Sequence, residues 1–243
     1  MAVIVGHRGV AGHAPENTLA GFTRAIELGL THVELDVRLT KDGVPVVHHD
    51  ASVVKLTHGS EPLRELTLAE VKALPVAEGR SVPSLDAVLD LVDGKLGLLI
   101  DLKSANALQP VLDRIEARGI ARAVLLASFD SQVLCEVKRR TPEVKTCLLF
   151  RHPVGFFFRR NERRLWAAVE SCGCEYIGPR ASVVTRELVE RAHTVGRKVY
   201  AYHVNARRGP RMLAWGVDAI GTDRPEQLDL TGAGTHNEKS HRA

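Results

Sequence analysis

Residues 32–50 read HVELDVRLTKDGVPVVHHD, two extended apolar runs separated by Asp42-Gly43. An Asp-Gly pair between such runs is a strong signal for a two-residue hairpin turn, because both residues tolerate the positive φ that a type I′ turn requires. We therefore predict that residues 44–49 return antiparallel along residues 32–39. In the register that this turn sets, His49 lies opposite Asp36.

The hairpin decides the fold because it accounts for a surplus strand. Short apolar runs alternate with helix-patterned segments along the whole chain, which is typical of a parallel sheet with crossover helices. Nine runs qualify as strands, and treating 44–49 as a return arm at the rim leaves eight parallel ones. The sequence therefore predicts an α/β fold, a (β/α)8 TIM barrel. The nine runs are 3–6, 32–39, 44–49, 96–102, 123–129, 145–150, 175–178, 198–204 and 218–221.

Helices are predicted between these strands. Leu19, Phe22 and Ile26 form one apolar stripe in the first helix, with Pro15 near its start and Gly29 at its end. Residues 51–83 hold turn signals and are predicted to be a small insertion at the carboxyl-end rim. We expect one domain over 1–230 and a polar, disordered tail over 231–243. The other predicted helices are 68–74, 85–91, 107–118, 132–140, 164–171, 186–195 and 207–215.

Composition narrows the function classes. The chain has 243 residues, of which 44% are hydrophobic and 26% charged, which excludes disordered and collagen-like classes. The net charge of +4 comes from scattered basic residues, which favours an anionic small molecule over nucleic acid. Neither a secretory signal nor a membrane-spanning run is visible, so we expect a cytoplasmic protein. The cysteines lack zinc-site spacing and are predicted to be free buried thiols: Cys135, Cys147, Cys172 and Cys174.

Three acidic residues occur toward the carboxyl ends of predicted strands, where TIM barrels hold their active sites. Glu34 and Asp36 share one face of their strand because side chains alternate along it, and Asp101 lies on the strand 96–102. Each buried unpaired charge costs several kcal/mol, and a divalent cation would remove the repulsion. An all-oxygen ligand set suits Mg²⁺ or Ca²⁺. We predict one divalent cation, Mg²⁺ first and Ca²⁺ as the alternative.

Cationic and titratable residues accompany these acids. Arg8 and Lys103 would add positive charge beside the metal and bind phosphate. His7 and His49 are two groups that exchange protons near neutral pH. A single E-x-D motif or a lone histidine is more often an ordinary surface feature, so the prediction depends on their joint occurrence at strand ends. Together they predict phosphodiester cleavage.

The segments GHRG, PENT, VELDVRLTKDGVPVVHHD, LLIDLK, ASFD, YAYHVN and GVDAIGTDRP occur in this order over residues 3–225. In order and spacing the chain resembles the glycerophosphodiester phosphodiesterase family, most of all its compact cytosolic bacterial members. The resemblance implies hydrolysis of glycerophosphocholine, glycerophosphoethanolamine or similar diesters to sn-glycerol 3-phosphate and an alcohol. It also implies these roles: catalytic His7 and His49, metal ligands Glu34, Asp36 and Asp101, phosphate contacts Arg8 and Lys103, and Tyr202 lining the glycerol pocket.

Two residues depart from the family pattern. Asp101 stands where the family usually has Glu, which shortens the ligand by one methylene. His203 stands where Thr is common; its ring either alters the pocket wall or, as we expect, faces the surrounding helices. The resemblance favours the glycerol 2-hydroxyl as nucleophile, with water as the alternative, and leaves open which of His7 and His49 is the acid.

Residues 151–164 leave a second function open. Residues 151–164, RHPVGFFFRRNERR, resemble a basic aromatic membrane-contacting loop, which would suit a lysophospholipase D or sphingomyelinase D type of enzyme acting on acylated lipids. Membrane contact through 156–164 is the alternative; we expect the phenylalanines to pack under the rim or in a homodimer contact. A non-catalytic module that binds a phosphorylated ligand is disfavoured because both histidines and all three acids are present.

Overall fold

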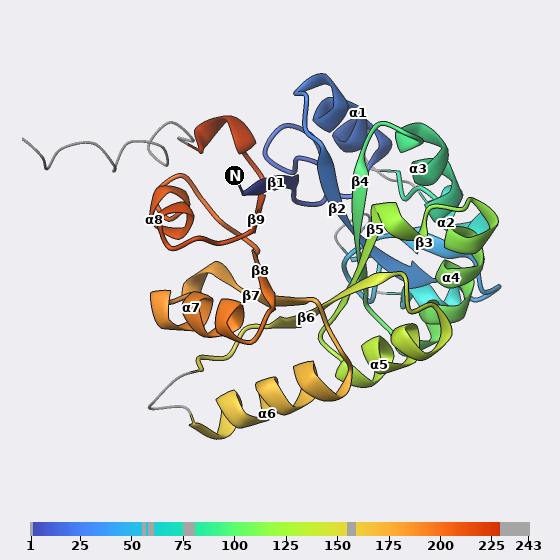
Figure 1. The fold of residues 1–243 in the computed structure, drawn as a ribbon. Coiled ribbons are helices and arrows are strands. Elements are labelled where there is room, and N and C mark those ends of the chain that lie inside the picture. Colours follow the sequence, from blue (N-terminus) through green and yellow to red (C-terminus); the bar gives the residue numbers. More distant parts are fainter. Residues whose placement is uncertain (1, 55–56, 58–60, 75–80, 155–158, 229–243) are drawn as a thin grey trace, which may run out of the picture.

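The computed structural model describes residues 2–54, 57, 61–74, 81–154 and 159–228. In this part of the chain nine strands form one sheet in the order β1-β9-β8-β7-β6-β5-β4-β2-β3, and β1 also pairs with β2. All pairings except β2–β3 are parallel, so eight strands close into a barrel (Figure 1), and the predicted TIM barrel is confirmed. The strands are β1 (Val3–Gly6), β2 (His32–Leu39), β3 (Pro45–Val47), β4 (Gly97–Leu102), β5 (Val124–Ser128), β6 (Lys145–Phe150), β7 (Tyr176–Pro179), β8 (Lys198–Ala201) and β9 (Ala219–Thr222).

Helices surround the barrel and follow the predicted segments closely (Figure 1). Side chains cap several of them; for example, the Thr18 hydroxyl accepts from the Gly21 N–H at the start of the first helix. That helix begins four residues after Pro15, and the sixth begins five residues before its predicted start at Arg164. The helices are α1 (Leu19–Glu27), α2 (Leu68–Lys72), α3 (Leu85–Val92), α4 (Leu108–Ala117), α5 (Ser131–Arg140), α6 (Arg159–Ser171), α7 (Arg186–Thr194) and α8 (Gly209–Ala214).

The hairpin exists, but its predicted register is wrong by one residue. Val37 pairs with Val47, and the His48 N–H donates to the Asp36 carbonyl over 2.9 Å. His48, not His49, therefore stands opposite Asp36 along the backbone. β3 ends at Val47, so strand alternation no longer determines where the two histidine side chains point.

The loop between the hairpin strands explains the error. The Thr40 N–H donates to the Val44 carbonyl over 3.1 Å, and the Thr40 carbonyl accepts from the Gly43 N–H over 3.0 Å, which leaves three loop residues instead of two. The Thr40 hydroxyl donates to the Asp42 carboxylate and accepts from the Val44 N–H, and Gly43 has a φ of 76°. A three-residue loop closed by a left-handed glycine is the next common hairpin connection. The Asp-Gly signal was correct, but the side-chain hydrogen bonds of Thr40 stabilise the longer loop.

The barrel interior is packed with apolar side chains. Val5, Leu99, Leu149, Tyr200 and Ala219 form an apolar cluster inside the barrel. Larger clusters fill the layer between the strands and the helices. Burying each large aliphatic side chain contributes roughly 1.5–3 kcal/mol, so the packed interior stabilises the barrel.

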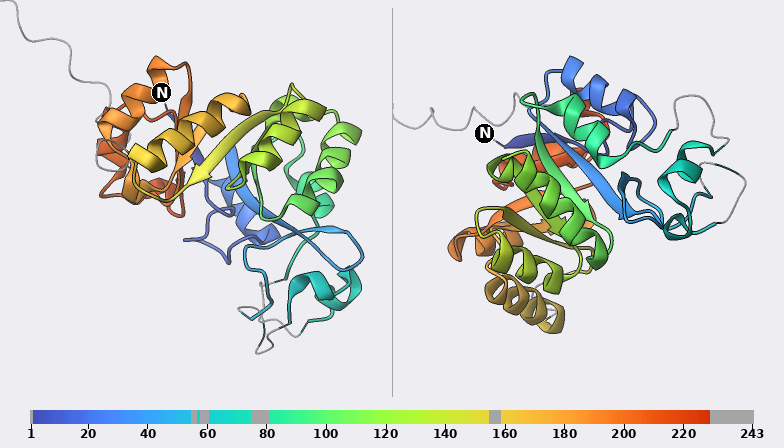
Figure 2. Two further views of the ribbon diagram at one scale, coloured as in Figure 1. Left: turned by 90° about the horizontal axis from the view of Figure 1, so that it is seen from below. Right: turned by 90° about the vertical axis from the view of Figure 1, so that its right-hand side faces the viewer.

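The predicted rim insertion follows β3. In both views of Figure 2 the segment that contains α2 projects from the barrel beyond the end of β2. Its described residues have a small core of their own, in which Val53, Leu63 and Val71 pack with Val46 of β3. A capping box of Thr67 and Glu70 begins α2.

The prediction about the cysteines is partly wrong, and two other predictions concern residues outside the described part of the chain. Cys135 and Cys172 form a disulfide, so the prediction of free thiols is wrong for this pair; it holds for the buried Cys147 and Cys174. The two cysteines are 37 residues apart in the sequence, and they come together because α5 and α6 are neighbours in the barrel wall. Phe156–Phe158 and the predicted tail 231–243 lie outside the described residues. Among the described helices, none has the length and apolar character that a membrane span needs.

Candidate active site

The three acidic side chains come together at the carboxyl end of the barrel. Glu34 and Asp36 lie on β2, and Asp101 lies beside Asp36 on β4 in the same register row. Their exposed fractions are 5%, 1% and 3%, and one carboxylate oxygen of each lies within 4.8 Å of the others. Asp101 Oδ1 is buried without a hydrogen-bond partner among the described residues. A buried carboxylate oxygen with no partner is costly unless a ligand satisfies it.

Two cations already partly neutralise this cluster. Lys103 Nζ lies 2.7 Å from Asp36 Oδ1 and 2.5 Å from Asp101 Oδ2. Arg8 Nε lies 3.1 Å from Asp36 Oδ2, and its Nη1 donates to Glu16 over 2.6 Å. The two predicted phosphate contacts thus border the acids, with their charges directed toward carboxylates.

The pKa values of the three acids reflect their burial and their closeness to one another. Burial, aided by the neighbouring charge of Asp36, raises the pKa of Glu34 to about 7, and burial raises that of Asp101 to about 6. Burial also acts on Asp36, but Lys103 and Arg8 outweigh it and hold the pKa of Asp36 well below its usual range. Three carboxylates in so small a buried space do not ionise together easily, and a divalent cation would favour the ionised form of each.

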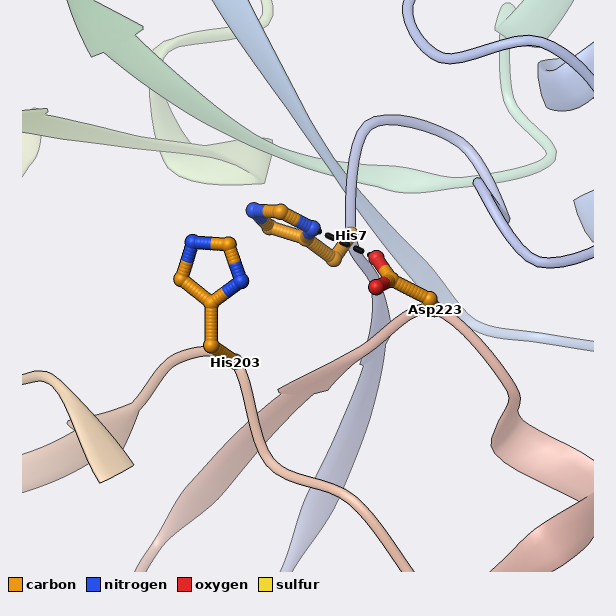
Figure 3. Close-up of side chains that lie close together, drawn as sticks. All are labelled: His7, His203 and Asp223. Carbon is orange, nitrogen blue, oxygen red and sulfur yellow. Dashed lines mark hydrogen bonds and ion pairs between the residues drawn. The ribbon is translucent and has the colours of Figure 1, made fainter. Parts of the chain in front are cut away.

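His7 lies between Glu34 of β2 and Asp223 after β9, the two strands that pair with β1, and Figure 3 shows its contact with Asp223. It follows β1, and its Nδ1 is 2.7 Å from Oδ1 of Asp223, which follows β9; its Nε2 is 3.9 Å from Glu34. The ring of His203 lies 4.4 Å away, centre to centre, at an interplanar angle of 59°. Burial lowers the pKa of His7, but Glu34 and Asp223 outweigh this and raise it above its ordinary value.

His49 reaches the same pocket from the hairpin. Its Nδ1 is 2.6 Å from Oδ1 of Asp50, and burial lowers the pKa of His49 despite the opposing effects of Asp36 and Asp50. His48 turns away, with its Nε2 3.2 Å from the Ser52 carbonyl. The expectation that His49 and not His48 joins the acids agrees with the geometry, although the register argument behind it was wrong.

Backbone strain marks the same place. The described non-glycine residues with positive φ are Arg8 (52°), Asn17 (59°) and His203 (56°); Arg8 and His203 line the pocket, and Asn17 donates to the pocket residue Asp36. Such conformations cost roughly 1–3 kcal/mol each and persist where the surroundings hold them. The Arg8 N–H donates to Glu34, and Asn17 both donates to and accepts from Asp36.

Gly6 allows the tight turn after β1 in which Arg8 has its positive φ. A Cβ added at Gly6 would lie 2.1 Å from the Gly9 carbonyl oxygen, so only glycine fits there.

The structure adds residues that sequence analysis missed and corrects one expectation. Asn17 and Asp223 occur in the quoted PENT and GTDRP segments but were assigned no role. His203 does not face the helices; it lines the pocket, because the chain leaves β8 and enters the left-handed region at this residue. The side chain of Tyr202 also lines the pocket, and its hydroxyl donates to the Phe150 carbonyl over 3.3 Å.

The pocket as a whole is a cavity of about 270 Å³ at the carboxyl end of the strands. It brings every residue predicted for the site into one space, with all three acids on β2 and β4 and the aromatic residues Phe129, Tyr200 and Tyr202 on or after β5 and β8. Its lining residues are His7, Arg8, Glu34, Asp36, His49, Leu99, Asp101, Lys103, Phe129, Leu149, Arg151, Arg180, Tyr200, Tyr202 and His203.

Comparisons with known proteins agree on one family. The model of the glycerophosphoryl diester phosphodiesterase family matches residues 7–227. A glycerophosphodiester phosphodiesterase of Caldanaerobacter subterraneus is 32% identical over 93% of this chain and 96% of its own length. A crystal structure from Silicibacter pomeroyi has a TM-score of 0.85 at 31% identity, covering 93% of this chain and 91% of that one. A glycerophosphodiester phosphodiesterase of Thermotoga maritima has a TM-score of 0.77 at 27% identity, covering 92% and 95%.

Proposed function

The chain belongs to the glycerophosphoryl diester phosphodiesterase family and is an enzyme of that class, and we propose that it hydrolyses glycerophosphodiesters in a metal-dependent reaction. The proposed substrates are small diesters such as glycerophosphocholine and glycerophosphoethanolamine, and the proposed products are sn-glycerol 3-phosphate and an alcohol. One observation carries this proposal: a buried cluster of three carboxylates lies between two histidines at the barrel mouth.

The residues present fit a divalent cation. Glu34, Asp36 and Asp101 offer an all-oxygen set, which suits Mg²⁺ first and Ca²⁺ as the alternative. The unpartnered Oδ1 of Asp101 supports a ligand at this point despite the shorter side chain. When bound, the cation would supply Lewis-acid stabilisation of the negative charge that develops on the phosphate oxygens.

The protein's own cations would position the phosphate. Arg8 and Lys103 are held beside the acids by ion pairs with Asp36, so their donors are already oriented before the substrate arrives. Preorganised donors of this kind stabilise charge that grows during the reaction without reorganising. Tyr202 would line the space for the glycerol or the alcohol.

The two histidines would move the protons. One would accept a proton from the nucleophile and the other would donate one to the leaving alkoxide, each contributing about 10²–10⁴ in rate. Asp223 and Asp50 would fix the rings through their Nδ1 atoms, so that Nε2 of each ring is available to the substrate. The favoured nucleophile is the glycerol 2-hydroxyl, which gives a cyclic phosphate intermediate, and attack by water is the alternative.

The test is release of sn-glycerol 3-phosphate from glycerophosphocholine by the purified protein. We expect turnover with Mg²⁺ or Ca²⁺, its loss in EDTA, and its return when the metal is added back. An Asp101→Asn variant should lose turnover while keeping its fold, and Asp113→Asn on the exposed surface of α4 is the matched control. Full activity in EDTA would contradict the metal-dependent proposal. Lysophosphatidylcholine in the same assay tests the acylated-lipid alternative.

A further inference from the structure

Two arginines in the pocket have no role in the proposed reaction. Arg151 follows β6 and Arg180 follows β7, and both side chains line the cavity and are exposed. Among the described residues neither guanidinium has a carboxylate within 4.0 Å, whereas Arg8 and Lys103 each contact at least one. The pocket therefore presents two cations whose charges no neighbouring acid balances.

The fold sets these arginines side by side. The Phe150 carbonyl accepts from the Arg180 N–H over 2.9 Å and from the Tyr202 hydroxyl over 3.3 Å. This links the residue before Arg151 to Arg180 itself. Two like charges on neighbouring strand ends repel each other, and an anion between them would remove that repulsion.

Their position lies across the mouth from the proposed chemistry. In the strand order around the barrel, β7 is four strands from β2 and β6 is four strands from β1, which is the opposite side of an eight-stranded ring. A phosphodiester bound at the acids would extend one of its substituents toward Arg151 and Arg180.

Phe129 forms the wall between the two sides. Its side chain is exposed to 47%, Lys103 Nζ lies 5.9 Å from its ring centre, and Arg151 Cζ also lies 5.9 Å from that centre. The two cations are therefore at most 11.8 Å apart. Tyr202 extends this wall with an edge-to-face contact to Phe129 at 6.2 Å. Lys103 follows β4 and Arg151 follows β6, the strands that pair with β5 on its two sides. Two cations flanking an aromatic side chain suit a ligand with two anionic groups and an uncharged middle.

We propose that Arg151 and Arg180 bind a second anionic group carried by the alcohol of the diester, so that the enzyme prefers glycerophosphodiesters whose head group bears a phosphate. This rests on the proposed function of the same site. Two phosphates separated by a short polyol or a six-membered ring are roughly 7–9 Å apart, from bond lengths of about 1.5 Å. That span lies within the upper limit of 11.8 Å on the separation of Lys103 Nζ and Arg151 Cζ. A quaternary ammonium head group would meet two like charges instead.

The test compares two substrates that differ only in one phosphate, glycerophosphoinositol and glycerophosphoinositol 4-phosphate. Release of sn-glycerol 3-phosphate from each gives kcat/KM, and we expect the phosphorylated substrate to be preferred about tenfold or more. Arg151→Ala and Arg180→Ala should each reduce that preference about tenfold. Arg151→Lys and Arg180→Lys keep the charge and should retain part of it. The preference should also weaken as the salt concentration rises.

Arg122→Ala is the matched control, because this exposed arginine lies at the opposite end of the barrel and its loss should leave the preference unchanged. Thermal melting of each variant separates misfolding from lost binding. Equal kcat/KM for both substrates in the wild type overturns the inference, as does an equal loss on both substrates in the arginine variants. Absence of turnover on either substrate and on glycerophosphocholine would instead reject the proposed function.

Discussion

The two histidines of the pocket share a residue type and a carboxylate at Nδ1, yet their surroundings differ. The His7 side chain is exposed to 6% and lies among Asp223, Glu34 and the ring of His203. The His49 side chain is exposed to 34% and has Asp50 as its ion-pair partner. Burial acts to lower the pKa of both histidines. The net effect is that the pKa of His7 is raised above its ordinary value, whereas the pKa of His49 is lowered. Charge partners outweigh burial on one side of the pocket and not on the other.

Removal of either ring should have the largest effect. We expect His7→Ala and His49→Ala each to reduce kcat about 10²- to 10⁴-fold on glycerophosphocholine, because each removes a proton-transfer group. The double variant should lose less than the product of the two single losses, since residues that act as a unit are not additive. His48→Ala, at the neighbouring position outside the pocket, is the control. Near-wild-type turnover in either single variant would remove that histidine from the mechanism.

Replacing the carboxylate partner of each histidine tests whether the more buried His7 depends more on its partner than His49 does. Asp223→Asn should reduce kcat about 10- to 100-fold, because the amide no longer fixes the ring and proton position of the buried His7. Asp50→Asn should cost less, because solvent can reach His49 and replace the lost contact. The ratio of the two losses in kcat, with KM measured alongside, is the readout. Equal losses would mean that exposure does not matter here.

The parts of the site that local patterns encode were predictable from the sequence. Glu34 and Asp36 were assigned to one face because the side-chain period of a strand is two, and that holds in β2. The contact between His7 and Asp223 joins residues 216 positions apart, and the hydrogen bonds of Asn17 join it to Asp36, 19 positions away. No local pattern encodes such partners.

The errors have a different cause. The hairpin register depended on a threonine side chain, and the direction of His203 depended on a left-handed backbone just past the end of β8. Both lie where regular alternation stops. The side-chain directions inside strands were therefore predictable, whereas the directions and long-range partners of the residues just after the strands were not.

Metal binding should reduce the difference between the pKa values of His7 and His49. In the metal-free protein, His7 should titrate above 6.5 and His49 below it. A cation on Glu34 cancels the attraction that raises the pKa of His7, so saturating Mg²⁺ should move its titration down by about one pH unit, the equivalent of ~1.4 kcal/mol. NMR of the ring protons, with and without metal, measures both values. A His7 titration that stays in place after Mg²⁺ has bound would show that Glu34 is not a ligand.

The smallest expected effect concerns His203, whose ring lies beside that of His7. Burial, followed by repulsion from His7 and Arg8, lowers the pKa of His203 to about 4. Between pH 6.5 and 4 the unfolded chain therefore binds a proton that the folded protein does not, so this group reduces stability as the pH falls through that window. His203→Asn removes the group and keeps a residue that tolerates a φ of 56°.

We expect the melting temperature of the wild type to fall more between pH 7.5 and 5 than that of His203→Asn, by ~1–2 °C because the ring is partly solvated. His193→Asn, on the exposed surface of α7, controls for the loss of a histidine elsewhere. An identical pH dependence in wild type and His203→Asn would show that His203 protonates as easily in the folded protein as in the unfolded chain. His7 would then keep its raised pKa without a neutral imidazole beside it, and the difference between the two sides of the pocket would depend on Glu34 and Asp223 alone.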